Sequence, residues 1–228
     1  MNITKRLFEL KDEKYKAFSE KLIPDTKLPI IGVRVPDLRK LAKSQTINEN
    51  AKEFLSEKHS YYEEVFLHGL IITYNKTDYK STIKLLDDFI PQIDNWSVCD
   101  CIAASVKISK KDSENYFNYL ISLLNDEKPY SVRFAIVSLK THFIPAKDAE
   151  ILQAINNVKS DNYYINMALS WLYCEMLIKD YSSAIQIIEE KQLSPFVQNT
   201  SIKKACESYR ISNDKKEYLK QFKLKNQK

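Results

Sequence analysis

An aromatic residue followed by a helix-like segment recurs along this sequence at a nearly constant interval, and this recurrence constrains the fold more than any other feature. The segments begin at Tyr62, Trp96, Tyr130, Tyr163 and Phe196, so that the steps are 34, 34, 33 and 33 residues. A unit of this length has room for two antiparallel helices, and stacked units of this kind form an α-solenoid. The sequence therefore predicts an all-α chain, folded as a short superhelix of HEAT-like helical hairpins.

The composition agrees with this fold class. The 228 residues include two glycines, Gly32 and Gly69, and the seven prolines are scattered. Rossmann units, P-loops and β-sandwiches need glycine at special backbone angles, so these folds are excluded. We expect a single domain over 1–228, with N-terminal helices in 1–44, repeats near 45–75, 76–109, 110–144, 145–179 and 180–210, and a terminal helix and tail in 211–228.

Periodicity and punctuation place the helices. Residues Ile3 to Ile23 read as one uninterrupted amphipathic helix that Pro24 ends, with Leu7, Phe18 and Leu22 near one face. Pro36 and Asp37 open the next helix, since proline suits the first turn and an acid suits its positive end. The later helices are expected near 61–74, 78–90, 95–108, 113–124, 130–143, 148–158, 163–178, 181–190, 195–209 and 214–222.

The repeat frame predicts which side chains point to the core. If the five aromatic residues are counted as position zero, positions 2, 5, 6 and 9 hold mainly aliphatic or small residues, which cluster on one side of a helix. The residues expected to be buried are Leu67, Ile71, Val98, Cys101, Ile102, Val132, Ala135, Ile136, Leu139, Ile165, Ala168, Leu169 and Leu172.

The opposite side of the same helices is predicted to form a second face, shared by successive repeats. Its residues are mostly aromatic, polar or basic, and in a solenoid they would line a concave basic groove. They are Trp96, Asp100, Lys107, Arg133, Ser138, Thr141, Asn166, Ser170, Trp171, Asn199, Lys203 and Lys204, with Phe134 and Met167 among them.

The charge balance and the cysteines bound the setting of the protein. A net charge of +5 suits a nucleic-acid partner without requiring one. The four cysteines form no CxxC pair and have no histidine at ligand spacing, so we expect free thiols in a reducing cytoplasm and no metal site. No segment resembles a signal peptide or a membrane span. Of the histidines, His68 falls on the buried side, whereas His59 and His142 lie near helix ends and are expected at the surface.

Two tryptophans, a carboxylate and a guanidinium on one face form an unusual set. Indole rings attract cations, Arg and Lys hold phosphates, and a lone carboxylate stabilises a nearby positive charge. Such a surface fits a polyanion that carries a local cationic centre. Taken singly, each residue has an ordinary alternative: either tryptophan could be core, Asp100 a solvated or capping residue, and Arg133 the partner of a carboxylate in the next repeat.

At these residues the chain resembles the AlkD-type DNA alkylation repair proteins, which are DNA glycosylases for alkylated purines built from HEAT-like repeats. The resemblance covers most of the chain and is carried by "IIGVRVPDLRKLAK" from Ile30, "WSVCD" from Trp96, "YSVRFAIV" from Tyr130 and "ALSWLYCEM" from Ala168. It implies that Asp100 is the catalytic carboxylate, that Trp96 and Trp171 flank the lesion nucleotide, and that Arg133 holds the DNA backbone beside it.

The resemblance also implies the substrate and the partners. These are damaged double-stranded DNA and cationic N3- or N7-alkylpurines, with no metal or organic cofactor and no membrane, and we expect a monomer. The polar face adds candidate DNA-binding residues, namely Lys107, Arg133, Asn166, Asn199, Lys203 and Lys204. The three histidines and Cys99 form no nucleophile–base pair that the sequence supports. The lysine-rich end, residues 215–228, is expected to be a frayed and solvated terminal helix.

The N-terminus is expected to depart from the family. In members with glycosylase activity, two short helices precede the "GVR" turn, and the second helps to recognise the lesion. The single helix expected over Ile3–Ile23 is similar instead to a divergent branch that lacks the second helix. Three functions follow as alternatives: an alkylpurine DNA glycosylase acting through Asp100, a non-catalytic relative that binds damaged or branched DNA, and a HEAT-like protein scaffold.

Overall fold

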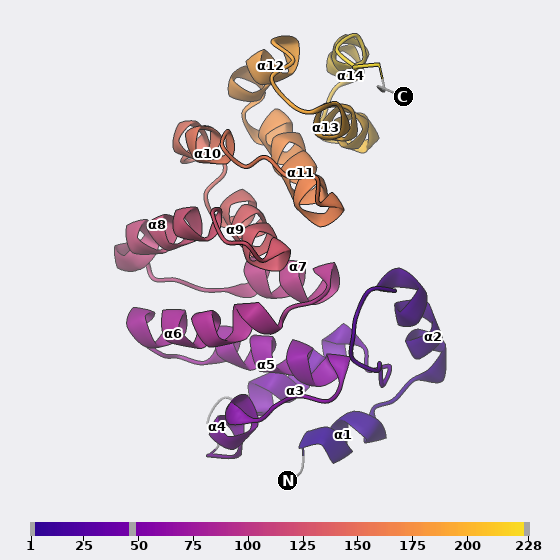
Figure 1. Cartoon of the computed structure of the whole chain (residues 1–228), viewed down its shortest axis with the longest axis vertical. Coiled ribbons are helices and arrows are strands. Elements are labelled where there is room, and N and C mark those ends of the chain that lie inside the picture. The colour runs from indigo at the N-terminus through magenta and orange to yellow at the C-terminus, as the bar shows by residue number, and fades with distance from the viewer. Residues whose placement is uncertain (1–2, 46–48, 226–228) are drawn as a thin grey trace. The chain divides into compact units, whose positions relative to one another are not determined.

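The computed structural model describes residues 3–45 and 49–225, and every regular element within them is helical (Figure 1). The all-α prediction is therefore confirmed for these residues. The chain divides into two compact units, residues 1–113 and 114–228. Each unit is described by itself below.

The first unit is a stack of helices that alternate between two rows. Helix α3 (Val35–Gln45) packs against α5 (Tyr62–Tyr74), and α5 packs in turn against α7 (Trp96–Ser105). Helices α4 (Glu49–Ser56) and α6 (Tyr79–Phe89) also contact α5. The remaining elements of this unit are α1 (Ile3–Glu9), α2 (Glu13–Leu22) and the 3-10 turns Ile90–Gln92 and Lys110–Asp112.

The second unit repeats this arrangement. Helix α11 (Tyr163–Lys179) packs against both α9 (Pro129–His142) and α13 (Pro195–Glu207). Helix α12 (Tyr181–Glu189) covers α11, and α14 (Asn213–Lys220) covers α13. The unit also contains α8 (Ser113–Leu123) and α10 (Asp148–Ile155). Successive α5-, α7-type helices thus stack side by side within each unit, as the repeat requires.

The five aromatic residues of the repeat all lie where a helix begins. Each is the first residue of α5, α7 or α11, or the second residue of α9 or α13 after a proline. Capping side chains set several of these starts. Asn95 accepts from the Val98 N–H at 3.0 Å, Asn162 from the Tyr164 N–H at 2.9 Å, and Ser194 from the Val197 N–H at 3.4 Å. These caps satisfy backbone donors that have no partner inside the helix.

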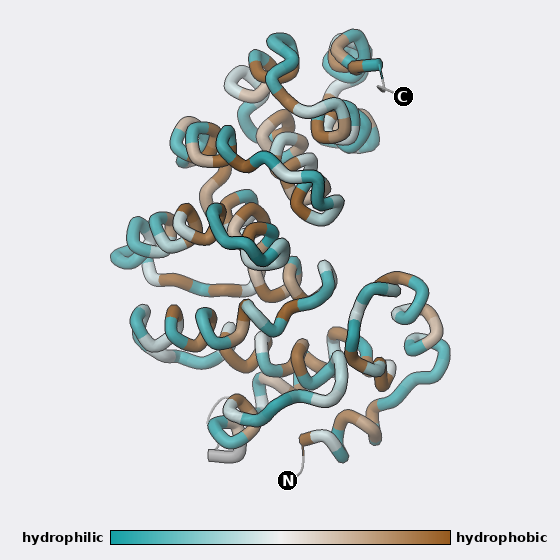
Figure 2. The backbone as a smooth tube through the Cα atoms, viewed as in Figure 1, coloured by the Kyte–Doolittle hydropathy of each residue, from teal (hydrophilic) through white to brown (hydrophobic). Residues whose placement is uncertain are grey.

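The predicted core stripe is confirmed, with one exception. All the residues expected at positions 2, 5, 6 and 9 are buried except Cys101, which is half-buried. The predicted second face is only partly exposed, because Arg133, Phe134, Ser138 and Ser170 are also buried. Helices α9 and α11 have neighbours on more than one side, so their second face is covered as well. Figure 2 shows hydrophobic and hydrophilic residues alternating along most helices.

The expectation of one N-terminal helix over Ile3–Ile23 is wrong. Two short helices, α1 and α2, precede Gly32, and the chain breaks at Asp12. The Asp12 carboxylate caps α2 by accepting from the Tyr15 N–H at 2.9 Å, and the Asp12 N–H donates to the Gly32 carbonyl. Arg34 binds the same carboxylate at 2.8 Å. An aspartate followed by a glutamate is an N-cap signal, so the reason for placing this chain in the branch without a second helix falls away.

The break also changes which residues of this segment are buried. Ile3 and Leu7 of α1 lie in the core, whereas Phe18 and Leu22 of α2 are exposed. The apolar face expected to run along one helix therefore splits into a buried half and an exposed half.

Glu63 holds the turn between α2 and α3. Its buried carboxylate accepts from the N–H groups of Ile31 at 2.8 Å, Gly32 at 2.7 Å and Val33 at 3.1 Å. Gly32 has φ of 102°, and a Cβ built on it would lie 2.6 Å from the Asp12 carbonyl. Glycine is required there because an L side chain would meet both a strained backbone angle and a clash.

The histidines divide differently from the prediction. His68 is buried as expected and His142 is exposed as expected, but His59 is buried too. The His59 Nε2 and His68 Nδ1 atoms lie 2.7 Å apart and share a hydrogen bond. His59 leaves the surface because this bond and the Phe54 ring, with centroids 4.7 Å apart, give it partners inside. All four cysteines are free thiols; Cys99 and Cys174 are buried.

Candidate functional site

The start of α7 presents Trp96 and Asp100 one helical turn apart. Residues at i and i+4 lie on the same side of a helix, and both side chains are half-buried, with part of each surface open to solvent. The buried Asn95 caps the helix and fixes the direction in which Trp96 leaves it. The Trp–Asp pair predicted from the "WSVCD" stretch therefore sits on one accessible face of α7.

Helix α2 docks onto this end of α7. The Trp96 indole N–H donates to the carbonyl of Leu22, the last residue of α2, over a long 3.4 Å. Beside it, the Asp94 carboxylate accepts from the Lys27 N–H at 2.7 Å and from the Thr26 hydroxyl at 3.0 Å. These bonds tie the end of α2 and the connector after it to the first turn of α7. The exposed Phe18 and Leu22 side chains belong to this docked helix.

Arg39 of α3 links three helices on the other side of Asp100. Its guanidinium donates to the Tyr74 hydroxyl at 2.9 Å, to the Cys101 sulfur at 3.0 Å and to the Ser105 hydroxyl at 3.2 Å. Burial raises the pKa of the Cys101 thiol, and the Arg39 charge offsets part of that rise. The thiol therefore stays protonated at neutral pH and acts as an acceptor for Arg39.

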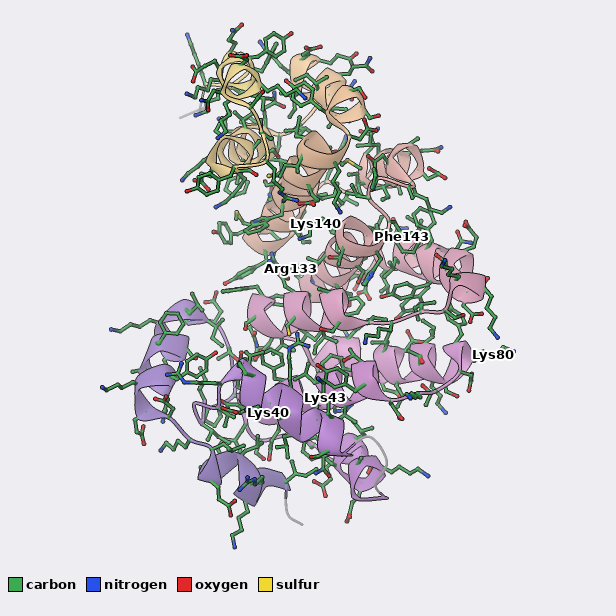
Figure 3. All side chains as sticks on the ribbon, turned by 180° about the vertical axis from the view of Figure 1, so that it is seen from behind. Lys40, Lys43, Lys80, Arg133, Lys140 and Phe143 are labelled. Atoms are coloured by element: carbon green, nitrogen blue, oxygen red, sulfur yellow. The ribbon has the colours of Figure 1, made fainter. Side chains whose placement is uncertain are left out.

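In the second unit, Trp171 of α11 lies between two lysines. It is 47% exposed, and the Nζ atoms of Lys140 from α9 and Lys204 from α13 each lie 5.5 Å from the centroid of its ring. Three neighbouring helices thus contribute to one basic and aromatic surface, which also includes the exposed Lys203 (Figure 3 labels Lys140). Ammonium groups at this distance attract the indole face.

A cluster of charged side chains follows Trp171 along α11. Glu175 lies one turn further on and pairs with Arg210 at 2.9 Å and with Lys179 at 3.4 Å. Burial alone would raise the pKa of the Glu175 carboxyl, but Arg210 and Lys179 together hold this pKa below its usual value. Glu175 therefore stays ionised and is matched by cations, so that the surface around Trp171 keeps its positive balance.

Arg133 lies inside the second unit. It is 6% exposed, and its guanidinium donates to the backbone carbonyl of Tyr164 at 2.6 Å. This bond joins α9 to the first turn of α11. The arginine expected to hold the DNA backbone is thus a buried link between two helices in this structure.

The other expected DNA-binding residues fall into two groups. The two amides bind the backbone of the chain: Asn166 donates to the Ser160 carbonyl at 2.8 Å, and Asn199 exchanges bonds with the N–H and carbonyl of Leu224. Lys107 and Lys203, by contrast, are exposed, and Lys204 pairs with Glu207 at 3.1 Å as well as with Trp171.

Within the described residues, no cluster of three or more His, Cys, Asp or Glu side chains has an arrangement that could hold a metal ion. None of the described helices has the length and apolar character of a membrane span.

Comparison with protein families explains this combination of helices and side chains. The family model described as "DNA alkylation repair enzyme" matches residues 3–209. The chain belongs to this family. Its role is therefore in DNA repair, in agreement with the resemblance seen at the tryptophans and Asp100. A comparison with curated proteins finds no match.

Membership in the DNA alkylation repair family directs attention to residues that the sequence patterns missed. Phe18 and Leu22 beside Trp96 were assigned to a buried stripe, and the capping signal at Asp12 was the feature that would have separated them. Lys140 lies at position 10 of the repeat frame, outside the positions assigned to the second face, although its neighbour Trp171 was assigned to that face. Nothing in the sequence pattern marks Arg39, whose three contacts come from separate helices.

Proposed function

We propose that this member of the DNA alkylation repair family is an alkylpurine DNA glycosylase that acts on double-stranded DNA, with Asp100 as its catalytic carboxylate. The observation that carries the proposal is the placement of Trp96 and Asp100 one turn apart on an accessible face of α7. The family match over 3–209 supports the DNA partner.

The reaction is the hydrolysis of an N-glycosidic bond. Alkylation at N3 or N7 gives the purine a positive charge, so it is already a good leaving group. As the bond between C1′ and N9 breaks, its electron pair goes to the base, which departs neutral, and positive charge develops on the sugar. Water adds to C1′, its proton passes to solvent, and an abasic sugar remains.

Asp100 has two tasks in this scheme. Its negative charge stabilises the oxocarbenium-like sugar, as carboxylates do in glycoside hydrolysis. Its oxygens also accept a hydrogen bond from the attacking water and so place that water next to C1′. The indole of Trp96 lies one turn away, where its face can stabilise the cationic base.

The second unit supplies the electrostatic grip. Lys140, Lys203 and Lys204 form a basic surface around Trp171, and such surfaces bind DNA phosphates. We propose that Trp171 and this surface bind the same duplex on which Asp100 acts. Arg133 would act by holding α11 in place and would reach DNA only if it released the Tyr164 carbonyl.

The test is release of the modified base from a duplex with one N7-methylguanine. We expect release by the wild-type protein and a loss of about 100-fold or more in the single-turnover rate for Asp100→Asn, because one oriented charge is removed. The matched control is Asp88→Asn, an exposed aspartate of α6 in the same unit, which should leave the rate unchanged.

Two outcomes would contradict the proposal in different ways. If the wild-type protein binds the duplex and releases no base, the chain is a non-catalytic DNA-binding relative. If Asp100→Asn releases base as fast as the wild-type protein, the reaction does not depend on Asp100.

A further inference from the structure

A cavity of about 450 Å³ lies in the first unit, at the C-terminal ends of α3, α5 and α7. Its wall includes three lysines from three successive segments: Lys43 near the end of α3, Lys76 after α5 and Lys107 after α7. Lys43, labelled in Figure 3, projects from α3. The same repeat that stacks these helices thus brings their terminal lysines to one place.

The charge of this cavity is strongly one-sided. None of its lining residues is acidic. The carboxylates of Asp78 and Asp112, in the adjoining segments, do not line it; they accept hydrogen bonds from Ser81 and Ser109. Three ammonium groups without a carboxylate in the wall repel one another, so an anion that binds among them lowers the electrostatic energy.

The wall holds the lysines in a defined arrangement. The Lys43 Nζ lies 5.5 Å from the centroid of the Tyr74 ring, and Arg39 fixes the Tyr74 hydroxyl. The hydroxyls of Thr77 and Thr82 bond to each other at 2.9 Å, and that of Thr82 also donates to the Asp78 carbonyl. The hydroxyls are thereby occupied, which leaves the ammonium groups as the donors for a ligand. Lysine ammonium groups bind phosphate as point charges.

The cavity lies in line with Asp100. Asp100, Ala104 and Lys107 are spaced at i, i+4 and i+7, which puts them on one side of α7 and its extension. At about 1.5 Å per residue, Lys107 is roughly 10 Å beyond Asp100 along this direction. Ala104 between them is exposed and small, so a strand lying over Asp100 has an unobstructed surface toward the cavity.

We propose that this cavity binds a DNA backbone phosphate next to the lesion nucleotide, with Lys43, Lys76 and Lys107 as its ligands. The site rests on the proposed DNA partner and extends it: it fixes the register of the strand on α7, so that the lesion sugar lies over Asp100. It differs from the surface around Trp171, which belongs to other helices in the second unit.

The decisive experiment replaces single phosphates of the duplex by neutral methylphosphonates, one position at a time. We expect one position near the lesion at which the replacement weakens binding by the wild-type protein. Lys76→Ala with Lys107→Ala should weaken binding to the unmodified duplex and should no longer respond to the replacement at that position. The slope of log K against log[salt] should become shallower by about 0.9 for the phosphate lost.

The matched control is Lys80→Ala with Lys84→Ala, two exposed lysines of α6 in the same unit (Lys80 is labelled in Figure 3). It removes the same charge and should keep both the wild-type salt slope and the sensitivity to the methylphosphonate. The single-turnover rate of base release at saturating protein should change less than twofold in the cavity variant, because the site positions the strand and leaves Asp100 intact.

The outcomes separate this inference from the proposed function. If the cavity variant and the control respond alike at every position, the cavity is not a phosphate site, even when the wild-type protein binds DNA and releases base. If the wild-type protein releases no base but shows the position-specific loss, the phosphate site stands and the glycosylase proposal fails. If inorganic phosphate binds in the cavity and DNA does not bind at all, the DNA assignment is overturned.

Discussion

The buried carboxylate of Glu63 holds together the turn that leads into α3. It accepts hydrogen bonds from three consecutive backbone N–H groups, those of Ile31, Gly32 and Val33. A carboxylate suits this position because its two oxygens accept without donating, and charge-assisted bonds are stronger than neutral ones. The turn then directs α3, whose Arg39 and Lys43 reach α7 and the lysine-lined cavity.

Glu63→Gln should lower the free energy of unfolding by about 3 kcal/mol. The new amide turns one acceptor into a donor that faces backbone donors, and a buried group left without its partner is costly. Urea denaturation measures the change. Glu53→Gln, at an exposed site on α4, is the matched control and should stay within about 0.5 kcal/mol of the wild-type value. Equal stability of the two variants would show that the three bonds contribute little.

Among the elements, α2 has the clearest functional consequence, because its docking onto α7 sets the surroundings of Trp96. The Asp94 carboxylate makes the shorter contacts of the interface, to Lys27 and Thr26, while the indole bond to Leu22 is long. Asp94 is therefore a positioning residue for Trp96 and for the exposed apolar side chains of α2.

Asp94→Ala should release the end of α2 and expose the Trp96 indole to water. The chain has two tryptophans, so a Trp171→Phe background leaves Trp96 as the only indole fluorophore. In this background we expect a red shift of the emission maximum and a gain in quenching by acrylamide of about twofold, with far-UV circular dichroism unchanged. Asp25→Asn, in the same connector, serves as the control. An unchanged Trp96 emission in Asp94→Ala would mean that α2 docks without this carboxylate.

The stability of the whole molecule should depend on pH through a buried histidine pair. Burial lowers the pKa of His68, and the nearby His59 lowers it further; burial likewise lowers the pKa of His59, against the opposing charge of Glu64. Such a histidine binds fewer protons when folded than when unfolded. Its contribution is fully present above the unfolded value of 6.5 and is lost as the pH falls below it.

Between pH 7 and pH 5, one histidine kept neutral by the fold should cost about 2 kcal/mol of stability. His68→Gln removes this proton while keeping a polar group beside His59, so its loss of stability over the same range should be smaller by about that amount. Thermal melts at the two pH values measure the difference, and His142→Gln, at an exposed site, should behave like the wild-type protein. The same loss in all three proteins would exclude the buried pair as its source.

Several parts of the fold and the site could be predicted from local patterns. The aromatic helix starts, the capping residues and the core positions depend on spacings of a few residues within one helix, and these were placed correctly for α5, α7, α9, α11 and α13. The Trp96–Asp100 pair was found for the same reason, because residues four apart on a helix must share a side.

Local spacing failed where a second element decides the outcome. The break at Asp12 depends on bonds to Gly32 and Arg34, about twenty residues away, and it leaves Phe18 and Leu22 exposed where periodicity predicted one buried stripe. Arg133 fell on the expected exposed face of its own helix, yet α11 covers it and accepts its hydrogen bond.

The repeat length, the helical class and the side of each helix that carries chemistry are encoded in periods of a few to about 34 residues, and any reader of the chain can find them. Contacts between segments far apart settled the rest. Arg133 meets a carbonyl 31 residues away, and Trp96 meets one 74 residues away. Lys43, Lys76 and Lys107 share a cavity only because α3, α5 and α7 stack. Periodicity describes one helix at a time, whereas burial and convergence depend on which other helix is packed against it.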